Sequence, residues 1–212
     1  MTRTRDRRIL TAIMAAALSL PAACGRESGG SRPGADQAKP DAPSTAPADQ
    51  PVNPDAKALE GFLQRVNEYV ALHQKLEGTL PKLSKEATPV DIDRHQRGLG
   101  RLIQDARRGA KPGDIFTAES QAVIKRLLTR VFGGADGAAL KASIMDENPG
   151  IPKINVNDRY PDTVPVSTIP PQVLQGLPRL PEEMEFRFVG DDLILMDAHA
   201  HLIADFIPHA LP

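Results

Sequence analysis

The chain has 212 residues, which is enough for one domain together with targeting and linker segments. Its 26 basic and 27 acidic side chains give a formal net charge of −1 at pH 7, and removing residues 1–23 would take away four arginines and one aspartate and leave −4. Nucleic-acid affinity depends on cationic side chains that neutralise phosphates, so this charge excludes a nucleic-acid-binding function.

The N-terminus has the organisation of an export signal. Four arginines lie within the first eight residues, and the apolar run Ile9–Leu20 is followed by small residues that lead to Cys24. A basic start, about a dozen apolar residues and a small-residue end are typical of a signal peptide that is removed after export. The run is too short to cross a bilayer comfortably, which takes about 20 apolar residues. We therefore expect residues 1–23 to be a cleaved signal peptide.

Cys24 is the only cysteine of the chain and cannot form an intramolecular disulfide. It directly follows "LPAA", which resembles the lipobox of bacterial lipoproteins, in which the cysteine is lipidated and becomes the new N-terminus. The match departs at one position, because Pro21 stands where the lipobox has an aliphatic residue. Lipidation at Cys24 would anchor the protein in the bacterial cell envelope with its domain in the periplasm. A soluble periplasmic or secreted protein is the alternative.

Residues 24–53 are expected to form a disordered tether. From residue 25 to residue 53 there is no aromatic side chain, and Val52 is the only large aliphatic one. Such a segment buries too little apolar surface to offset the entropy lost on ordering. Behind a lipidated cysteine it would hold the domain away from the membrane.

Residues 54–147 have the periodicity of about four amphipathic helices. In the first, large apolar residues and His73 recur at spacings of three and four from Leu59 onward. Thr88, Thr117 and Asp136 are expected to cap the second, third and fourth helices. In the second helix we expect the inward-facing side chains to be Ile92, Leu99, Leu102, Ile103 and Ala106.

Residues 148–181 contain eight of the twenty prolines of the chain. Proline removes a hydrogen-bond donor from helix interiors and strand ladders, so this segment predicts an extended belt, with one turn of helix at 171–176. We expect the belt to pack over the helices with the side chains of Ile154, Val156, Tyr160, Val166 and Ile169.

Residues 182–212 have the alternation of a small antiparallel sheet. A two-residue turn at Gly190-Asp191 would pair Phe188 with Leu193 and Phe186 with Leu195. "LIADFI" predicts a third strand, with a short helix as the alternative. The polar side chains expected to face water are Glu185, Arg187 and Asp192.

The predicted fold is therefore α+β. An N-terminal bundle of about four helices packs with a small C-terminal antiparallel β-meander, and a Pro-rich extended segment joins them within one globular domain, residues 54–212.

The stretch "DAHAH", Asp197 to His201, raises the question of a metal site. Imidazoles two residues apart on a strand point the same way and lie about 6.6 Å apart at Cα, close enough to converge on one ion. Metal-dependent amidohydrolases have a similar HxH, but this chain is too short for their barrel. A third or fourth ligand would come from elsewhere, and the candidates are Asp205, His209 and His95. The competing interpretation is a turn in which Asp197 bonds the backbone while His199 and His201 reach the rim of the sheet.

The remaining polar residues favour structural roles. His73 lies on the apolar face of the first helix, where a hydrogen-bonded core histidine is the commoner interpretation, and His95 lies beside the face of the second. The carboxylate pairs 91/93, 182/183 and 191/192 resemble ordinary helix starts and turns, and the basic segment 107–114 resembles a solvated helix end. The chain has no nucleophile elbow, phosphate loop, HExxH or CxxC.

Three stretches resemble an uncharacterised group of exported bacterial proteins of the lipoprotein type. They are "YVALHQKLEG" (69–78), "GAKPGDIFT" (109–117) and "LPRLPEEMEFRFVGDDLILMDAHAHLIADFIP" (177–208). The resemblance covers most of the predicted domain. It implies export but no activity, so it assigns no catalytic residue.

The sequence thus predicts an exported, lipid-anchored cell-envelope protein that acts as a non-enzymatic binding or structural module. Its partner would be an envelope protein, a peptide or a cell-wall component, and it would contact the membrane only through its anchor. The alternative is a metal-dependent hydrolase that uses Asp197, His199 and His201, with a divalent metal as its only cofactor. A weaker hypothesis is a carrier with an apolar pocket between the helices and the sheet.

Overall fold

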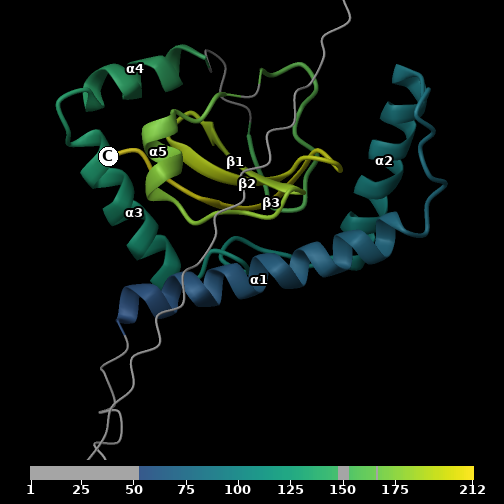
Figure 1. The fold of residues 1–212 in the computed structure, drawn as a ribbon, viewed down its shortest axis with the longest axis horizontal. Helices are drawn as coiled ribbons and strands as arrows, with labels where there is room; N and C mark the ends of the chain where they lie inside the picture. Colours follow the sequence, from purple (N-terminus) through teal and green to yellow (C-terminus); the bar gives the residue numbers. More distant parts are fainter. Residues whose placement is uncertain (1–52, 148–152, 166) are drawn as a thin grey trace, which may run out of the picture. The chain divides into compact units, whose positions relative to one another are not determined.

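The computed structural model describes residues 53–147, 153–165 and 167–212, which belong to one compact unit. The predicted signal peptide, Cys24 and the predicted tether up to residue 52 lie outside the described residues. The helices are α1 (Pro54–Glu77), α2 (Pro89–Ala106), α3 (Ala118–Phe132), α4 (Gly137–Asp146) and α5 (Pro171–Gly176). The strands are β1 (Met184–Val189), β2 (Asp192–Asp197) and β3 (Leu202–Ile207). This order confirms the α+β fold (Figure 1).

Two of the three predicted helix caps are confirmed. The Thr88 hydroxyl accepts a hydrogen bond from the Asp91 amide, and the Asp91 carboxylate accepts one from the Thr88 amide, which makes a capping box at the start of α2. The Thr117 hydroxyl accepts a bond from the Ser120 amide and so caps α3. Asp136 precedes α4, but its side chain makes no capping hydrogen bond, so that prediction is wrong.

The main core lies between one face of the sheet and the helices. α1 contributes Phe62 and Val66, both fully buried, and Phe62 stacks on Phe116 with ring centroids 4.9 Å apart. α1 runs along one side of the sheet while α3 covers one end (Figure 1). The side chains that the sheet adds to this core come from alternate strand positions, including Phe186, Phe188, Leu193 and Leu195.

The predicted hairpin is confirmed to the residue. Phe188 pairs with Leu193 and Phe186 with Leu195, so the connection between β1 and β2 has two residues. Gly190 has φ +58°, the left-handed region that the first central position of such a turn requires and that glycine enters without strain. β3 pairs antiparallel with β2, which confirms the strand prediction for the final run over the helix alternative.

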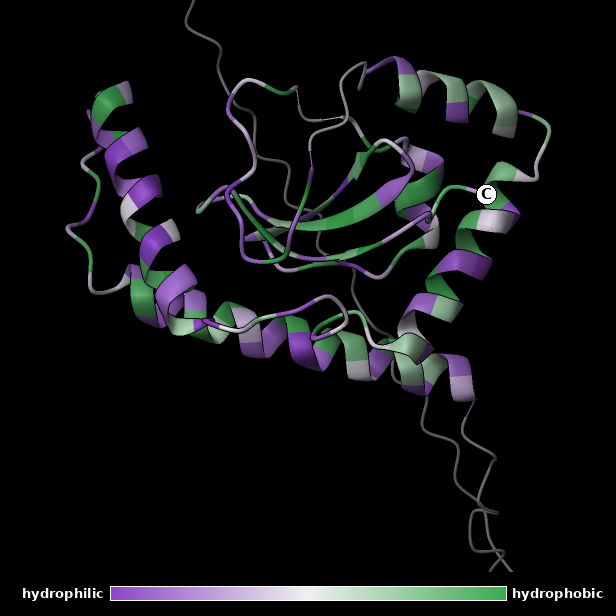
Figure 2. Ribbon diagram, turned by 180° about the vertical axis from the view of Figure 1, so that it is seen from behind, coloured by the Kyte–Doolittle hydropathy of each residue, from purple (hydrophilic) through white to green (hydrophobic). Residues whose placement is uncertain are grey.

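The Pro-rich belt was predicted to pack over the helices, but Ile154 and Tyr160 pack against the sheet instead. A second core lies on the other face of the sheet, where Tyr160 and Ile154 from the belt cover Ile194, Met196 and Ile203. Ile169 does join the main core, and residue 166 lies outside the described residues. Both faces of the sheet are therefore buried, and the strands form the most continuously apolar part of the ribbon (Figure 2).

The belt also bonds to both outer strands. The Asn157 amide donates to the Ile203 carbonyl, the Ile203 amide donates to the Asp158 carbonyl, and the Tyr160 amide donates to the His201 carbonyl. These bonds occupy the outer edge of β3 at Ile203 and the turn just before the strand. On the outer edge of β1, the Ser167 hydroxyl donates to the Phe188 carbonyl at 2.6 Å and accepts from the Phe188 amide at 3.0 Å.

Replacing Ser167 by alanine should lower the free energy of unfolding by about 1–3 kcal/mol, because both backbone groups of buried Phe188 would lose their partner. Equilibrium urea denaturation measures this change. Ser84→Ala, at an exposed position between α1 and α2, is the matched control and should change stability by less than about 0.5 kcal/mol. Equal effects from the two substitutions would contradict the role given to the Ser167 hydroxyl.

The inward face predicted for α2 holds only in the middle of the helix. Leu99 and Ile103 are fully buried, whereas Ile92 is 49% exposed and Ala106 is also exposed. The N-terminal part of α2 lies away from the sheet (Figure 1), and the helix as a whole is largely hydrophilic (Figure 2). Ile92 therefore has no core to enter.

Candidate metal centre

Asp197 ends β2 and is completely buried. Its Oδ1 accepts a hydrogen bond from the Ala200 amide at 2.8 Å, which confirms the prediction that the carboxylate bonds the backbone of the following turn. Its Oδ2 accepts a hydrogen bond from the Tyr69 hydroxyl at 2.9 Å and lies 2.6 Å from Nδ1 of His73. The buried carboxylate therefore has partners from α1 as well as from its own turn.

His73 projects from α1 with no solvent exposure, and its two ring nitrogens meet different environments. Asp197 is an acceptor, so the short contact with Nδ1 fixes the proton of the neutral ring on that nitrogen. Nε2 is buried without a hydrogen-bond partner, although it lies 3.4 Å from Oε2 of Glu77, one helical turn further along α1. In the neutral ring Nε2 is thus an acceptor beside a carboxylate, which does not donate to it, whereas in the protonated ring the two groups would form an ion pair.

Glu77 is approached by histidines from three separate parts of the chain. Besides His73 on α1, His199 comes from the turn between β2 and β3, with Nδ1 3.6 Å from Oε1 of Glu77. His95 comes from α2, with Nε2 3.5 Å from the same oxygen. One ligand atom each from His73, Glu77 and His199 lies within 4.8 Å of the other two. Two imidazoles and a carboxylate at this spacing are a ligand set that zinc uses.

The charges around the cluster favour a cation. Burial lowers the pKa of His73, but the hydrogen bond and charge of Asp197, together with the charges of Glu77 and Glu183, outweigh it and raise the pKa above its ordinary value. A hydrogen bond from Gln74 holds the pKa of Glu183 below its usual range. Positive charge on or beside His73 is therefore stabilised, whether it is carried by a proton or by a metal ion.

Tyr69 is positioned by one contact at its hydroxyl and one over its ring. Burial and then the neighbouring charge of Asp197 raise the pKa of its hydroxyl well above its ordinary value, so Tyr69 remains a donor to Asp197. The guanidinium of Arg107 lies over the ring, 4.9 Å from its centroid, and donates to the carbonyl of Ala204. Arg107 is thus not part of a solvated helix end, as the sequence suggested.

The structure does not bring Asp197, His199 and His201 together as three ligands. His199 reaches the rim, as predicted, with its side chain 45% exposed. His201 has φ +53° and faces the belt, where it packs edge-on against Tyr160 and lies 4.0 Å from Asp162. Asp197 lies behind His73 and holds its ring.

Of the other predicted ligands, only His95 lies beside the cluster. Nε2 of His95 lies 3.5 Å from Oε1 of Glu77. Asp205 lies elsewhere and accepts hydrogen bonds from backbone amides of the segment before α3. His209 pairs with Asp191 at 2.7 Å, and its amide donates to Asp192 at 2.9 Å. Those last three residues are close enough for an ion, but their mutual hydrogen bonds already account for the arrangement.

Sequence reasoning missed Glu77 and the orientation of His73. The signal was present, because His73 and Glu77 are four residues apart and so share one face of α1. The contribution of the turn residue His199 to the same cluster depends on packing between segments more than a hundred residues apart.

Comparison of the chain with protein families, with curated proteins and with solved structures gave no match. The resemblance to exported bacterial proteins therefore stays a prediction. In the described part of the chain, no helix has both the length and the apolar character needed to cross a membrane.

Proposed function

We propose that this domain binds a divalent transition metal, with zinc as the best fit, through His73, Glu77 and His199. The observation that carries the proposal is the fully buried Nε2 of His73, which has no hydrogen-bond partner and faces the other two ligands. A neutral imidazole whose other nitrogen donates to a carboxylate is the usual form of a metal-binding histidine. Asp197 supplies that carboxylate, and Tyr69 holds Asp197.

The distances support a small tetrahedral ion. Ligand atoms that lie about 2.0–2.1 Å from zinc in tetrahedral geometry are about 3.3 Å apart from one another. Oε2 of Glu77 lies 3.4 Å from Nε2 of His73 and Oε1 lies 3.6 Å from Nδ1 of His199, and one ligand atom from each residue lies within 4.8 Å of the other two, so the side chains would close in around the ion when it binds. Magnesium and calcium prefer oxygen ligands and fit two imidazoles poorly.

In the cell we propose that the protein is exported and anchored in the bacterial envelope through Cys24, where the domain acts as a metal-binding module and not as an enzyme. The support is the basic and apolar start of the chain, followed by a single cysteine after small residues. An envelope protein, a peptide or a cell-wall component remains the proposed partner.

The anchor is tested by Cys24→Ser in a bacterial host. We expect the wild-type protein to sediment with membranes and to carry the added mass of a lipid, and the variant to lose both properties. Fractionation with immunoblotting and intact-mass spectrometry measure the change. Identical mass and identical membrane association of the two proteins would rule out lipidation.

The metal site is tested by titrating zinc into metal-free protein, using calorimetry and competition with a chromogenic chelator. We expect one ion per chain, and a loss of at least tenfold in affinity on His73→Gln, Glu77→Gln or His199→Ala. Asp197→Asn, which weakens the support of His73, should lower affinity about 10- to 100-fold. His201→Gln, at a ring that packs against Tyr160 of the belt and lies outside the cluster, is the control and should bind zinc normally.

Stability measurements separate ligand loss from unfolding. Because the His199 side chain is half exposed, His199→Ala should cost well under 1 kcal/mol in metal-free protein. Zinc at about 100 times its dissociation constant should stabilise the wild type by about 2.7 kcal/mol and should stabilise this variant much less. Stoichiometric zinc binding that survives in both His73→Gln and His199→Ala would refute the proposed ligand set.

A metal-dependent hydrolase is the second candidate, because two histidines and one carboxylate leave the fourth tetrahedral position open. Catalytic zinc sites hold a water molecule there and lower its pKa. In such a hydrolase His73, Glu77 and His199 would hold the metal, while Asp197 would hold the ring of His73 through its hydrogen bond to Nδ1. Zinc-dependent hydrolysis of simple esters or amides, lost on Glu77→Gln, would favour it over the binding module.

A further inference from the structure

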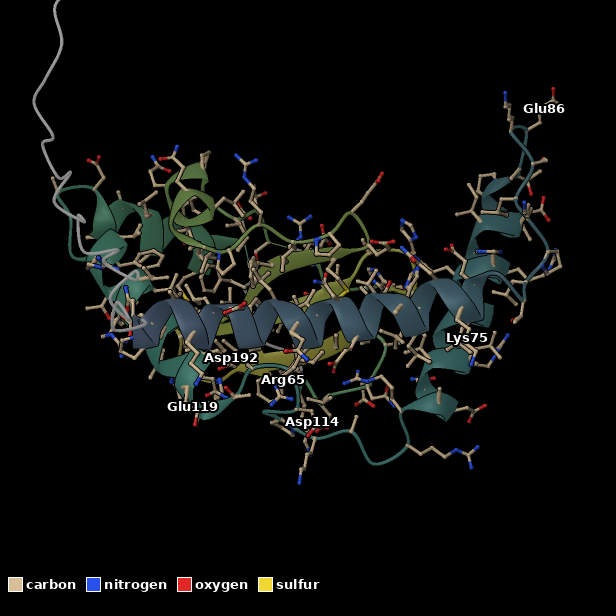
Figure 3. The ribbon with its side chains drawn as sticks, turned by 60° about the horizontal axis from the view of Figure 1, so that its bottom comes forward. Arg65, Lys75, Glu86, Asp114, Glu119 and Asp192 are labelled. Atoms are coloured by element: carbon tan, nitrogen blue, oxygen red, sulfur yellow. The ribbon has the colours of Figure 1, made fainter. Side chains whose placement is uncertain are left out.

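Two cavities that share lining residues lie along the connection between α1 and α2, and together they form a groove whose lining includes one proposed metal ligand, Glu77. Their volumes are about 480 Å³ and 390 Å³. Both are lined by Leu80, Lys82, Leu83 and His95, and the smaller one is also lined by Glu77. Figure 3 shows the connection extending beyond the end of α1, past Lys75, with Glu86 near its tip. We call this space the α2 groove.

The wall of the α2 groove that the connection forms is largely apolar. The connection contributes Leu80, Leu83 and Ala87, and Leu83 is 44% exposed although it is a large aliphatic residue. On the opposite wall, Gly98 of α2 leaves room for the side chain of Leu80 to pack closely against the helix. An apolar ligand segment would therefore find contact surface along the connection, while the α2 wall presents the charged side chains of Asp91, Arg94 and Arg101.

The charged residues of the α2 groove favour an anion. Among the described residues, Lys82 and Arg101 have no ion-pair partner, whereas Arg94 pairs with Asp91 at 3.0 Å. The Arg94–Asp91 pair is neutral, and Lys82 and Arg101 together outweigh the single negative charge of Glu77, so the lining has a net positive charge. A metal ion beside Glu77 would increase that excess at one end.

We propose that the α2 groove binds an amphipathic carboxylate, a linear apolar chain with one carboxylate head group, and that the head group occupies the open position of the metal. This inference rests on the proposed metal site. Carboxylate oxygen is an ordinary zinc ligand, and three protein ligands leave one position for it. His95 lines both cavities and so lies where the head group would enter.

The apolar lining favours an alkyl chain over a peptide. A peptide would bring an amide N–H and C=O for every residue, and each pair would need partners once removed from water. Ser84 is the one uncharged hydroxyl or amide side chain in the lining of the larger cavity and Gln74 is the one in the smaller, so the described lining offers few neutral partners for these groups. An alkyl chain has no such requirement.

The test uses decanoate as the probe and the metal-loaded full domain as the receptor. Calorimetry should show decanoate binding to zinc-loaded protein at least tenfold more tightly than acetate, because each buried methylene contributes up to about fourfold in affinity. Decanol should bind at least tenfold more weakly than decanoate. With cobalt in place of zinc, decanoate should also change the visible spectrum of the ion.

Two groove variants and two matched controls localise the effect. Leu83→Asp and Lys82→Gln should each weaken decanoate binding at least threefold while zinc affinity stays within twofold of the wild type. Leu174→Asp, at an exposed leucine of α5, and Lys57→Gln, at the start of α1, should leave decanoate binding unchanged.

The outcomes separate this inference from the proposed function. Normal zinc binding without decanoate binding overturns the groove ligand and leaves the metal site intact. Equal decanoate affinity with and without metal, or an unchanged cobalt spectrum, overturns coordination by the head group. Tighter binding of an apolar peptide with a free carboxyl terminus overturns the choice of an alkyl chain. Failure to bind zinc overturns both the site and the inference.

Discussion

Asp205→Asn should lower the free energy of unfolding by about 3–5 kcal/mol, one of the largest effects expected for any substitution in this domain, because two buried donors would each lose an acceptor at a cost of about 1–3 kcal/mol. Asp205 is completely buried in β3. Its Oδ2 accepts hydrogen bonds from the amides of Ile115 and Phe116, both at 2.8 Å. Its Oδ1 accepts hydrogen bonds from the amides of Gly113 and Phe206 at 3.1 Å and 2.8 Å. Four donors thus converge on one carboxylate.

Asparagine cannot replace this carboxylate, because one of its two terminal groups is a donor. Its NH₂ group would face two backbone amides, so two buried N–H groups would lose their acceptor and would meet another donor instead. Denaturation in urea measures the loss. Asp136→Asn is the control, because the exposed Asp136 side chain makes no capping bond, and it should change stability by less than about 0.5 kcal/mol. A loss below 1 kcal/mol at Asp205 would contradict the structural role given to its carboxylate.

Phe188→Ala should cost about 3–5 kcal/mol, the range for truncating a large buried aromatic side chain. Phe188 is fully buried in the main core and packs edge-on against Phe132, with ring centroids 6.3 Å apart. The substitution leaves the backbone bonds to Ser167 in place, so the cost reports the loss of packing and the resulting cavity.

The same denaturation experiment tests Phe188→Ala, with an unchanged slope against urea concentration as the sign that unfolding remains cooperative. Leu174→Ala is the control, because Leu174 is 50% exposed, and we expect less than about 1 kcal/mol from it. A loss at Phe188 no larger than at Leu174 would mean that the sheet does not close the core as described.

The hairpin could be predicted from sequence because its determinants are local. Alternation with a period of two and a glycine at the first turn position fix both the register and the inward face of β1. The starts of α2 and α3 were predictable for the same reason, since Thr88 and Thr117 act within a single turn of helix.

The position of the Pro-rich belt could not be predicted in this way. Its prolines remove periodicity, and its bonds to β3 join segments that are more than forty residues apart. One local signal did exist. Residues 193–196 read "LILM" without alternation, and a continuous apolar run is typical of a strand buried on both faces. Ile194 and Met196 are indeed covered by the belt.

The candidate metal centre was predictable only in part. His199 and the backbone bond of Asp197 followed from the position of the turn, but the ligand set depends on where α1 crosses the end of β2. His73 and Asp197 are 124 residues apart in sequence and 2.6 Å apart in space. A buried polar residue on a helix needs a partner, yet the sequence does not identify which partner it will have.

The belt's bonds to the outer strands have a consequence for association between copies of the protein. An exposed strand edge is a template on which another chain can add a strand, and such pairing leads to aggregation. Here the outer edge of β3 is bonded by residues 157–160, and the Phe188 position on the outer edge of β1 is bonded by Ser167. At these positions the sheet offers no free backbone groups to a neighbouring molecule, so the belt blocks the addition of another strand there.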